Sequence, residues 1–157
     1  MKTADLCDRY AEELQIAEPG LLDFGGHKTF SGVIVTLKIF EDNSLVREEL
    51  GNSGENKVLV VDGGGSLRCA LLGDNLATLA VDNYWSGIVI NGCVRDSAEL
   101  GALQLGIRAL NTHPLKSIKL GIGERQVSVR FSGITFRPGD YLYADQDGIV
   151  VATQSLH

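Results

Sequence analysis

Cysteine is scarce in this 157-residue chain, and long apolar runs are absent. The three cysteines, at positions 7, 69 and 93, include no Cys-x-x-Cys pair, so neither a disulfide framework nor a zinc site is indicated. We expect them to be small buried side chains. The apolar runs, such as Val58–Val61 and Ile88–Ile90, are far shorter than the ~20 residues of a membrane-spanning helix. The first residues also lack the apolar stretch of a secretory signal, which predicts a cytoplasmic protein without membrane contact.

Positive charge is in the minority, with 14 Lys and Arg against 20 Asp and Glu and a formal net charge of −6. An acidic chain repels phosphate groups, so direct binding of nucleic acid is disfavoured. The best basic patch, residues 116–119, holds only two lysines, and an acidic surface could instead meet a basic protein partner. The three histidines show no metal-ligand spacing. Length and a hydrophobic fraction of 44% fit a single domain over residues 1–157.

The hydrophobic pattern changes along the chain. Its first part alternates strand-like and helix-like segments, which is typical of an α/β fold. Strands are predicted over 32–40, 58–61, 67–72 and 87–91. Helices are predicted at the start, with Thr3 as N-cap and Leu14 on the same face as Leu6 and Tyr10, and then over 44–50, over 74–83 and briefly from Asp96. Past Pro114 the pattern is β, with strands over 126–131, 134–136, 141–144 and 149–152. The prediction is an α/β domain with a mixed sheet and a β-rich C-terminal part.

Two strand-to-helix junctions resemble each other: residues 71–76 and residues 91–96. Each places an aspartate, Asp74 or Asp96, where a helix is predicted to begin. The first N–H groups of a helix have no intrahelical acceptor and carry partial positive charge, so they attract anions. A ligand carboxylate could therefore be held at the start of the first helix, with Arg95 from the second junction as a bidentate partner.

Simpler interpretations exist for the same residues. Asp74 and Asp96 could be plain N-caps, the stretch 96–99 has the spacing of a capping box, and Arg95 could be a surface residue. Spacing alone favours these structural roles. Residues 58–66 also imitate the strand and glycine-rich loop of an S-adenosylmethionine site. That loop should open a helix, whereas the following stretch 67–72 is strand-like, so a methyltransferase is disfavoured.

A resemblance over longer stretches of the sequence favours the functional interpretation of these residues over the structural one. From residue 24 onward the chain resembles the family of the regulator of ribonuclease E activity A and the 4-hydroxy-4-methyl-2-oxoglutarate aldolases. The residues that carry the resemblance are Phe24-Gly25-Gly26, Phe40-Glu41-Asp42-Asn43, the run Val58–Ser66, Gly133-Ile134-Thr135-Phe136 and Tyr143-Ala144-Asp145. The aldolase branch is marked by an aspartate, twenty intervening residues and then Arg-Asp, and Asp74 with Arg95-Asp96 matches that spacing.

The resemblance implies a swivelling β/β/α domain and a specific site. The turn formed by Gly73, Asp74, Asn75 and Leu76 would bind the pyruvoyl part of the substrate together with Arg95, and Asp96 would ligate a divalent cation, Mg²⁺ or Mn²⁺. The cation would polarise the 2-oxo group, Arg95 would stabilise the enolate, and a water positioned by Asp74 would accept the 4-hydroxyl proton.

The implied activity is metal-dependent cleavage of 4-hydroxy-4-methyl-2-oxoglutarate to pyruvate. Decarboxylation of oxaloacetate is expected as a side activity, because it produces the same enolate. Longer members add a C-terminal carboxylate to a neighbouring subunit's site; with the sequence ending at His157, we expect less efficient aldolase turnover. The alternative is a non-enzymatic homotrimer that binds and inhibits ribonuclease E. Regulators of the enteric type lack an aspartate after the arginine, whereas Asp96 is present here.

Overall fold

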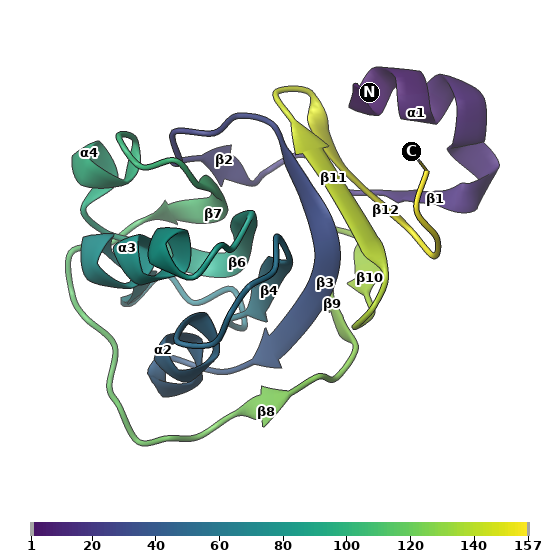
Figure 1. Cartoon of the computed structure of the whole chain (residues 1–157). Helices are drawn as coiled ribbons and strands as arrows, with labels where there is room; N and C mark the ends of the chain where they lie inside the picture. Colours follow the sequence, from purple (N-terminus) through teal and green to yellow (C-terminus); the bar gives the residue numbers. More distant parts are fainter. Residues whose placement is uncertain (1, 157) are drawn as a thin grey trace.

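The computed structural model describes residues 2–156 and contains one large mixed sheet, with three helices on one side and the N-terminal helix beside the C-terminal strands (Figure 1). The helices are α1 Thr3–Tyr10, α2 Ser44–Leu50, α3 Asp74–Asp82 and α4 Ser97–Leu100, with a 3₁₀ turn at Ala11–Glu13. The strands are β1 Leu14–Ile16, β2 Leu22–Asp23, β3 Phe30–Lys38, β4 Val58–Asp62, β5 Ala70–Leu72, β6 Gly87–Val94, β7 Gly106–Thr112, β8 Glu124–Arg125, β9 Val129–Phe131, β10 Ile134–Phe136, β11 Tyr141–Asp145 and β12 Gly148–Ala152.

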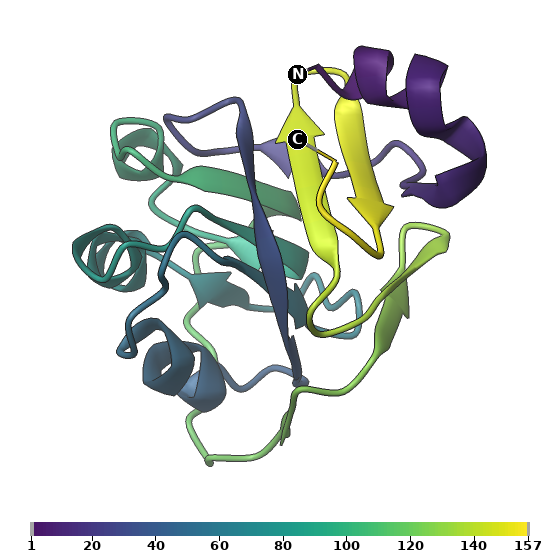
Figure 2. The same ribbon diagram turned by 45° about the vertical axis from the view of Figure 1, so that its right-hand side comes forward.

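The sheet runs in the order β1-β12-β11-β3-β4-β6-β7-β2, with β5 paired to β6 and β8 paired to β3. The strands β3, β4, β6 and β7 are parallel, and a crossover that carries a helix joins each to the next. Strands β11 and β12 form an antiparallel hairpin beside β3. Figure 2 shows the helices α2 to α4 on one side of β3 and the yellow C-terminal strands on the other. The expectation of a mixed sheet with a β-rich C-terminal part is confirmed.

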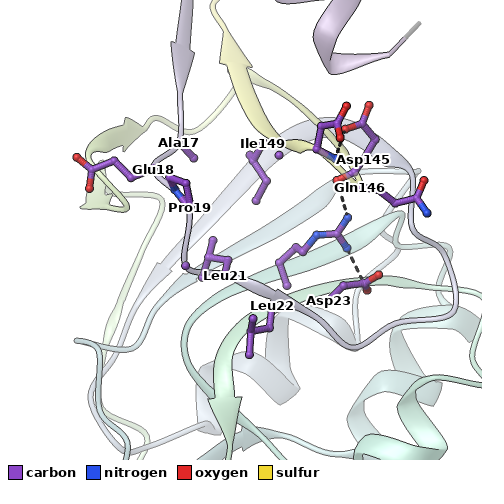
Figure 3. A pocket seen from close by; sticks show the side chains of 13 residues that line it. Ala17, Glu18, Pro19, Leu21, Leu22, Asp23, Asp145, Gln146 and Ile149 are labelled. Carbon is purple, nitrogen blue, oxygen red and sulfur yellow. Dashed lines mark hydrogen bonds and ion pairs between the residues drawn. The ribbon is translucent and has the colours of Figure 1, made fainter.

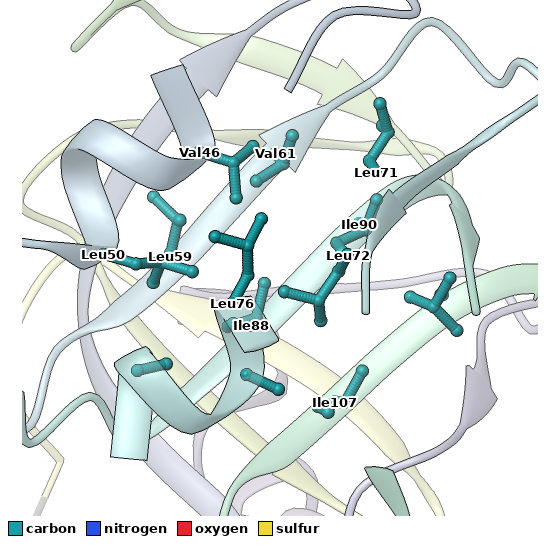
Figure 4. Packing of buried hydrophobic residues seen from close by; sticks show 14 of the residues in the cluster. Val46, Leu50, Leu59, Val61, Leu71, Leu72, Leu76, Ile88, Ile90 and Ile107 are labelled. Carbon is teal, nitrogen blue, oxygen red and sulfur yellow. The ribbon is translucent and has the colours of Figure 1, made fainter. Parts of the chain in front are cut away.

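Apolar residues fill both faces of the parallel strands. On the helix side, alternate residues of β4 and β6 pack against α2 and α3; Figure 4 shows this cluster, which includes Val46, Leu50, Leu59, Val61, Leu76, Ile88 and Ile90. On the other side, Val58, Val60 and Val89 pack beneath the β9–β10 and β11–β12 hairpins. Because both faces are covered, β4 and the first half of β6 are apolar runs without alternation, which is why these two strands could be recognised from the sequence.

Several predicted boundaries are wrong. The N-cap of α1 is Lys2 and not Thr3. The Thr3 hydroxyl instead donates a hydrogen bond to Asp145 Oδ1 at 2.7 Å. Leu14 lies in β1 rather than on the helix. The predicted strands 67–72 and 126–131 shrink to β5 and β9, because the residues preceding each form loops. Strand β7, which the sequence analysis did not identify, completes the parallel layer.

The expectation that the cysteines are buried is confirmed for two of the three, whereas Cys7 is only partly buried. Cys69 and Cys93 are buried, and burial raises the pKa of both thiols, so they are apolar packing groups rather than nucleophiles. No helix within residues 2–156 is long and apolar enough to cross a membrane.

Candidate active site

The two strand-to-helix junctions lie next to each other. Strand β5 pairs in parallel with β6, with Leu72 opposite Val94, so the chain leaves both strands at the same edge of the sheet. The Arg95 N–H donates a hydrogen bond to the carbonyl of Leu72 at 2.9 Å and fixes the second junction against the first. A site shared by Asp74, Arg95 and Asp96 requires these junctions to meet, and they do. Ligands of open α/β sheets bind at this carboxyl edge.

Asp96 connects the junctions through its side chain. Its Oδ2 accepts a hydrogen bond from the backbone N–H of Asp74 at 3.0 Å, at the first residue of α3. This hydrogen bond lowers the pKa of Asp96, with further lowering by the Asp74 side chain and the charge of Arg95 against the opposing effect of burial. The residue that precedes α4 therefore caps α3, and the predicted capping box over 96–99 does not form, because the Asp96 side chain makes no cap hydrogen bond to α4.

The backbone of Asp96 is unusual as well. Its φ of 58° and ψ of 42° lie in the left-handed region, which is uncommon for residues other than glycine. Such conformations persist where surrounding contacts hold them, and they concentrate at functional sites. At this position the conformation turns the Asp96 carboxylate back toward α3 rather than forward along α4.

Gly73 is required by this close approach. A Cβ atom at Gly73 would lie 2.7 Å from Asp96 Oδ2 and 3.4 Å from Arg95 Nε. Real Cβ atoms essentially never approach another heavy atom within 3.0 Å. A side chain at position 73 would therefore push the carboxylate and the guanidinium away from the start of α3. Glycine allows these two groups to converge on one place.

All six predicted site residues line one small cavity of about 70 Å³. Its walls are Asn43, Arg47, Ala70, Leu72, Gly73, Asp74, Asn75, Leu76, Arg95, Asp96, Lys116 and Lys119. The site thus carries two carboxylates and four basic side chains. The first-turn N–H groups of Asn75 and Leu76 have no intrahelical acceptor, which leaves them available to an anion.

Four polar wall residues were not identified as site residues from the sequence. Arg47 lies on α2, and Lys116 and Lys119 come from the loop that follows β7. Asn43 is 8% exposed; its Nδ2 donates to the Leu71 carbonyl at 3.0 Å, while its Oδ1 is buried with no hydrogen-bond partner among residues 2–156. A buried acceptor without a donor is rare, and here it lies in the wall of a cavity. The lysines could have been found only as the weak basic patch 116–119.

Asp42 holds that loop in place. It is 4% exposed and accepts hydrogen bonds from the N–H groups of Leu120 at 2.9 Å and Ile122 at 3.1 Å, as well as from Ser44. Burial alone would raise the pKa of Asp42, but these hydrogen bonds outweigh it and lower the pKa to about 2. Asp42 therefore ties the lysine-bearing loop to the start of α2 beside the cavity.

The donor atoms fit a cation that retains most of its water. No group of three or more His, Cys, Asp or Glu side chains is placed to hold a metal within the described residues. One Asp96 oxygen is used by the Asp74 N–H, and a carboxylate has further lone pairs to offer. Mg²⁺ is typically bound through one or two carboxylates together with waters and substrate oxygens, so this site suits Mg²⁺ or Mn²⁺ rather than zinc.

The protein is thus an α/β protein with a curled mixed sheet and a small charged cavity between two adjacent strand-to-helix junctions. The profile of the RraA-like family, described as Aldolase/RraA, matches residues 3–151. The chain belongs to this family, and the resemblance seen in the sequence is confirmed.

Curated relatives cover nearly the whole chain. A protein of Laribacter hongkongensis is 62% identical over 98% of this chain and 97% of its own length. A protein of Alkalilimnicola ehrlichii is 63% identical over 98% of this chain and 96% of its own length. Both are provisionally named 4-hydroxy-4-methyl-2-oxoglutarate aldolase.

Solved structures share the fold. The RNA-processing inhibitor RraA of Thermus thermophilus superimposes with a TM-score of 0.97 at 43% identity, covering 100% of this chain and 95% of its own. A Geobacillus kaustophilus structure described as an S-adenosylmethionine:2-dimethylmenaquinone methyltransferase gives a TM-score of 0.97 at 52% identity, covering 99% and 97%. In the present chain the glycine-rich loop after β4 leads to strand β5 and not to a helix, so it lacks the strand–loop–helix context of a methyltransferase cofactor site.

Proposed function

We propose that this protein is a divalent-metal-dependent carbon–carbon lyase that cleaves 4-hydroxy-4-methyl-2-oxoglutarate to pyruvate, with oxaloacetate decarboxylation as a side activity. The observation that carries the proposal is the convergence of the Gly73–Leu76 turn, Arg95 and Asp96 on one cavity. The names of the curated relatives support the same activity.

Asp96 is the residue that would hold the cation, Mg²⁺ or Mn²⁺. When bound, the cation supplies Lewis-acid polarisation of the substrate's 2-oxo group. Arg95 offers a planar guanidinium beside Asp96, which suits the carboxylate and the developing enolate of a 2-oxo acid. The N–H groups of Asn75 and Leu76 would receive the same carboxylate at the positive end of α3. Asp74 would position the water that accepts the 4-hydroxyl proton.

The cationic wall suits the rest of the substrate. A 4-hydroxy-2-oxo diacid carries a second carboxylate, and Arg47, Lys116 and Lys119 line the same cavity. The buried Oδ1 of Asn43 is an acceptor for a substrate hydroxyl or a water. Four basic side chains against two carboxylates give the cavity a positive balance within an acidic chain, which favours a dianionic ligand.

We further propose that the chain, as a single domain over residues 1–157, assembles into a homotrimer in the cytoplasm. The loop that carries the cavity lysines also exposes Leu115, Ile118, Leu120 and Ile122, each between 59% and 68% exposed. Four exposed large apolar side chains in one segment are typical of a surface that another subunit covers. Sedimentation equilibrium tests the trimer directly, and a monomer at micromolar concentration would contradict it.

A coupled pyruvate assay tests the activity. Purified protein is given oxaloacetate or 4-hydroxy-4-methyl-2-oxoglutarate, with EDTA or with Mg²⁺, Mn²⁺ or Co²⁺ restored. We expect pyruvate release that EDTA abolishes and that Asp96→Ala removes, while Asp62→Ala, a change at the β4 terminus outside the cavity, retains it. Absence of enzyme-dependent pyruvate with every cation would contradict the proposal.

The second candidate function is inhibition of ribonuclease E. It is favoured by the 43% identity to the RNA-processing inhibitor RraA and by the net charge of −6, which suits a basic protein partner. Such binding would use the surface and not the cavity. It would weaken steeply with salt, be indifferent to EDTA and survive Asp96→Ala. Binding measured by surface plasmon resonance at two salt concentrations separates the two functions.

A further inference from the structure

Three basic side chains of the candidate active site have no carboxylate partner among residues 2–156. Arg47 comes from α2, and Lys116 and Lys119 come from the loop after β7; all three are exposed and line the small cavity. None of the four ion pairs between described residues involves them. These three residues are the cationic wall. In a chain with more acidic than basic side chains, such cations beside a cavity indicate an anionic ligand.

A larger cavity, of about 400 Å³, shows the opposite arrangement and shares no residue with the candidate active site (Figure 3). It is lined by residues 17–23, residues 145–149 and Arg108. Arg108 is buried, and its Nη1 lies 3.1 Å from Asp23 Oδ1. Its Nη2 donates hydrogen bonds to the carbonyls of Lys28 and Asp145. The protein itself provides partners for this guanidinium, so an anionic ligand is expected at the cationic wall and not at Arg108.

The backbone around Lys116 is held against the cavity from both sides. Before it, the carbonyl of Leu115 accepts a hydrogen bond from the Ala70 N–H at 2.7 Å. After it, the hydroxyl of the buried Ser117 accepts a hydrogen bond from the Asn43 N–H at 3.1 Å. Ala70 and Asn43 line the same cavity, so these contacts fix the position from which the Lys116 side chain extends.

Lys119 is held in the same way. The N–H of Ile118, before it, donates a hydrogen bond to the Glu41 carbonyl at 3.1 Å. The N–H of Leu120, after it, donates to Asp42 Oδ2 at 2.9 Å. The fold therefore places both lysines at the cavity through their neighbours' backbone atoms, while their ammonium groups remain without a carboxylate among the described residues.

The cavity is large enough for only one end of a substrate. Its volume of about 70 Å³ is well below the ~300–1,000 Å³ of pockets that surround a whole small molecule. Arg95 and the start of α3 are assigned above to the 2-oxo acid end. The other end of the substrate is therefore expected at the mouth of the cavity, where the exposed side chains of the cationic wall can reach it.

The cationic wall matches a phosphate better than a single carboxylate. A carboxylate brings one negative charge and two oxygens, whereas a phosphate monoester brings about −1.5 to −2 charges at pH 7 and three acceptor oxygens. One guanidinium and two ammonium groups, which come from two separate segments of the chain, can each contact a different oxygen of a phosphate.

We propose, on the basis of the lyase activity proposed above, that the substrates include 4-hydroxy-2-oxo acids with a terminal phosphate, which Arg47, Lys116 and Lys119 bind. In the reaction the 4-hydroxyl loses its proton and the C3–C4 bond breaks. The electron pair of that bond goes to C3 and gives the enolate of pyruvate, while C4 becomes the carbonyl carbon of an aldehyde phosphate. Protonation of C3 then gives pyruvate, so the reaction needs no further reactant.

Two sugar acids that differ only in the phosphate test this preference: 2-keto-3-deoxy-6-phosphogluconate and 2-keto-3-deoxygluconate, each assayed together with its C4 epimer. Pyruvate release by the full-length protein is measured with Mg²⁺ or Mn²⁺ present. We expect kcat/KM to be about 10- to 100-fold higher for the phosphorylated acid, because three exposed ion pairs each contribute a factor of up to about five.

Single charge removals locate the phosphate. Lys119→Gln and Arg47→Gln should each lower the ratio of the two kcat/KM values by about fivefold, mainly by raising KM for the phosphorylated acid. Lys2→Gln removes the same charge at an exposed position before α1, outside the cavity, and should leave the ratio unchanged.

Calorimetric titration in EDTA, where no cleavage is expected, measures binding apart from turnover. The phosphorylated acid should bind more tightly than both 2-keto-3-deoxygluconate and inorganic phosphate, and Lys119→Gln should weaken its binding. Inorganic phosphate that binds as tightly as the phosphorylated acid would indicate a site for the free ion and would overturn the proposal.

The outcomes separate this proposal from the lyase itself. If 4-hydroxy-4-methyl-2-oxoglutarate releases pyruvate but the phosphorylated sugar acid is not preferred, or if the preference survives both charge removals, the phosphate site is wrong and the lyase stands. If no compound releases pyruvate, the lyase is wrong. Equal calorimetric affinity for the two sugar acids would then overturn the phosphate site too, whereas a preference that Lys119→Gln removes would support it.

Discussion

Replacing Gly73 by alanine should damage the site with little effect on folding. The backbone at Gly73 has φ −131° and ψ −169°, an extended conformation that alanine adopts freely, so no backbone strain is expected. The added Cβ would start 2.7 Å from Asp96 Oδ2, whereas ordinary contact begins at 3.4 Å, so the carboxylate must move by roughly 0.7 Å. That movement disturbs the 3.0 Å hydrogen bond to the Asp74 N–H and displaces the neighbouring guanidinium of Arg95.

Catalytic groups generally need placement within ~0.5 Å, and misplacement by about 1 Å can lower rates about 100-fold. We therefore expect Gly73→Ala to reduce kcat/KM for pyruvate release by about 10- to 100-fold and to weaken Mn²⁺ binding. Stability should fall by no more than the ~1.5–3 kcal/mol of one charge-assisted hydrogen bond. Steady-state kinetics, calorimetric Mn²⁺ titration and thermal unfolding measure the three quantities.

A matched control is available at Gly101. A Cβ atom there would lie 3.6 Å from its nearest neighbours, which is ordinary contact, and its backbone is helical. Gly101→Ala should keep the activity and the Mn²⁺ affinity of the unmodified protein. If Gly73→Ala also keeps both, the close approach of Asp96 to the start of α3 has no role in the site, and the reasoning is refuted.

Three further predictions concern the cavity walls and the aspartate that anchors the lysine-bearing loop beside them. Asp42→Asn should lower the free energy of unfolding by about 2 kcal/mol at pH 7, because it weakens charge-assisted hydrogen bonds to the 120–122 loop. The folded-state pKa of about 2 lies below the ordinary 3.8, so this stabilisation is present above pH ~4 and is lost toward pH ~2; chemical denaturation across that range should show the two proteins converging. Asn43→Ala should raise KM and cost about 1–2 kcal/mol of stability, because the Leu71 carbonyl loses its donor, and an unchanged KM in steady-state assays would remove Asn43 from the site. Arg95→Lys should lower kcat/KM by about 10- to 100-fold, because lysine cannot form the bidentate contact, and retained activity would contradict that contact.

The parts of the fold that the sequence predicted are those determined locally. The run Val58–Val61 is apolar on both faces, and Gly73-Asp74 marks the start of a helix, so β4 and α3 were found near their observed bounds. Strand β7, over Gly106–Thr112, ends in polar residues and lacks a clear period, and its pairing with β6 and β2 defines it. Thr3 was mistaken for a cap because its true partner, Asp145, is distant in the sequence.

The site residues also fall into two groups: those that the local sequence marks and those that only packing brings to the cavity. The two aspartates and Arg95 were found because each follows a strand, and parallel pairing of β5 with β6 brings such positions together. The sequence could not show that Asp96 caps α3 instead of α4, because that depends on how the junctions pack. The contribution of Lys119 depends on Asp42 anchoring a loop almost eighty positions away, which no local pattern encodes.

The most direct test of the central claim is Mn²⁺ binding followed by electron paramagnetic resonance, with and without pyruvate. If Asp96 holds the cation and Arg95 holds the 2-oxo acid in one cavity, pyruvate should tighten Mn²⁺ binding to the unmodified protein. Asp96→Asn should lose Mn²⁺ binding, and Arg95→Lys should keep it but lose the effect of pyruvate. Equal Mn²⁺ affinity in the unmodified protein and Asp96→Asn, with no response to pyruvate, would contradict the account.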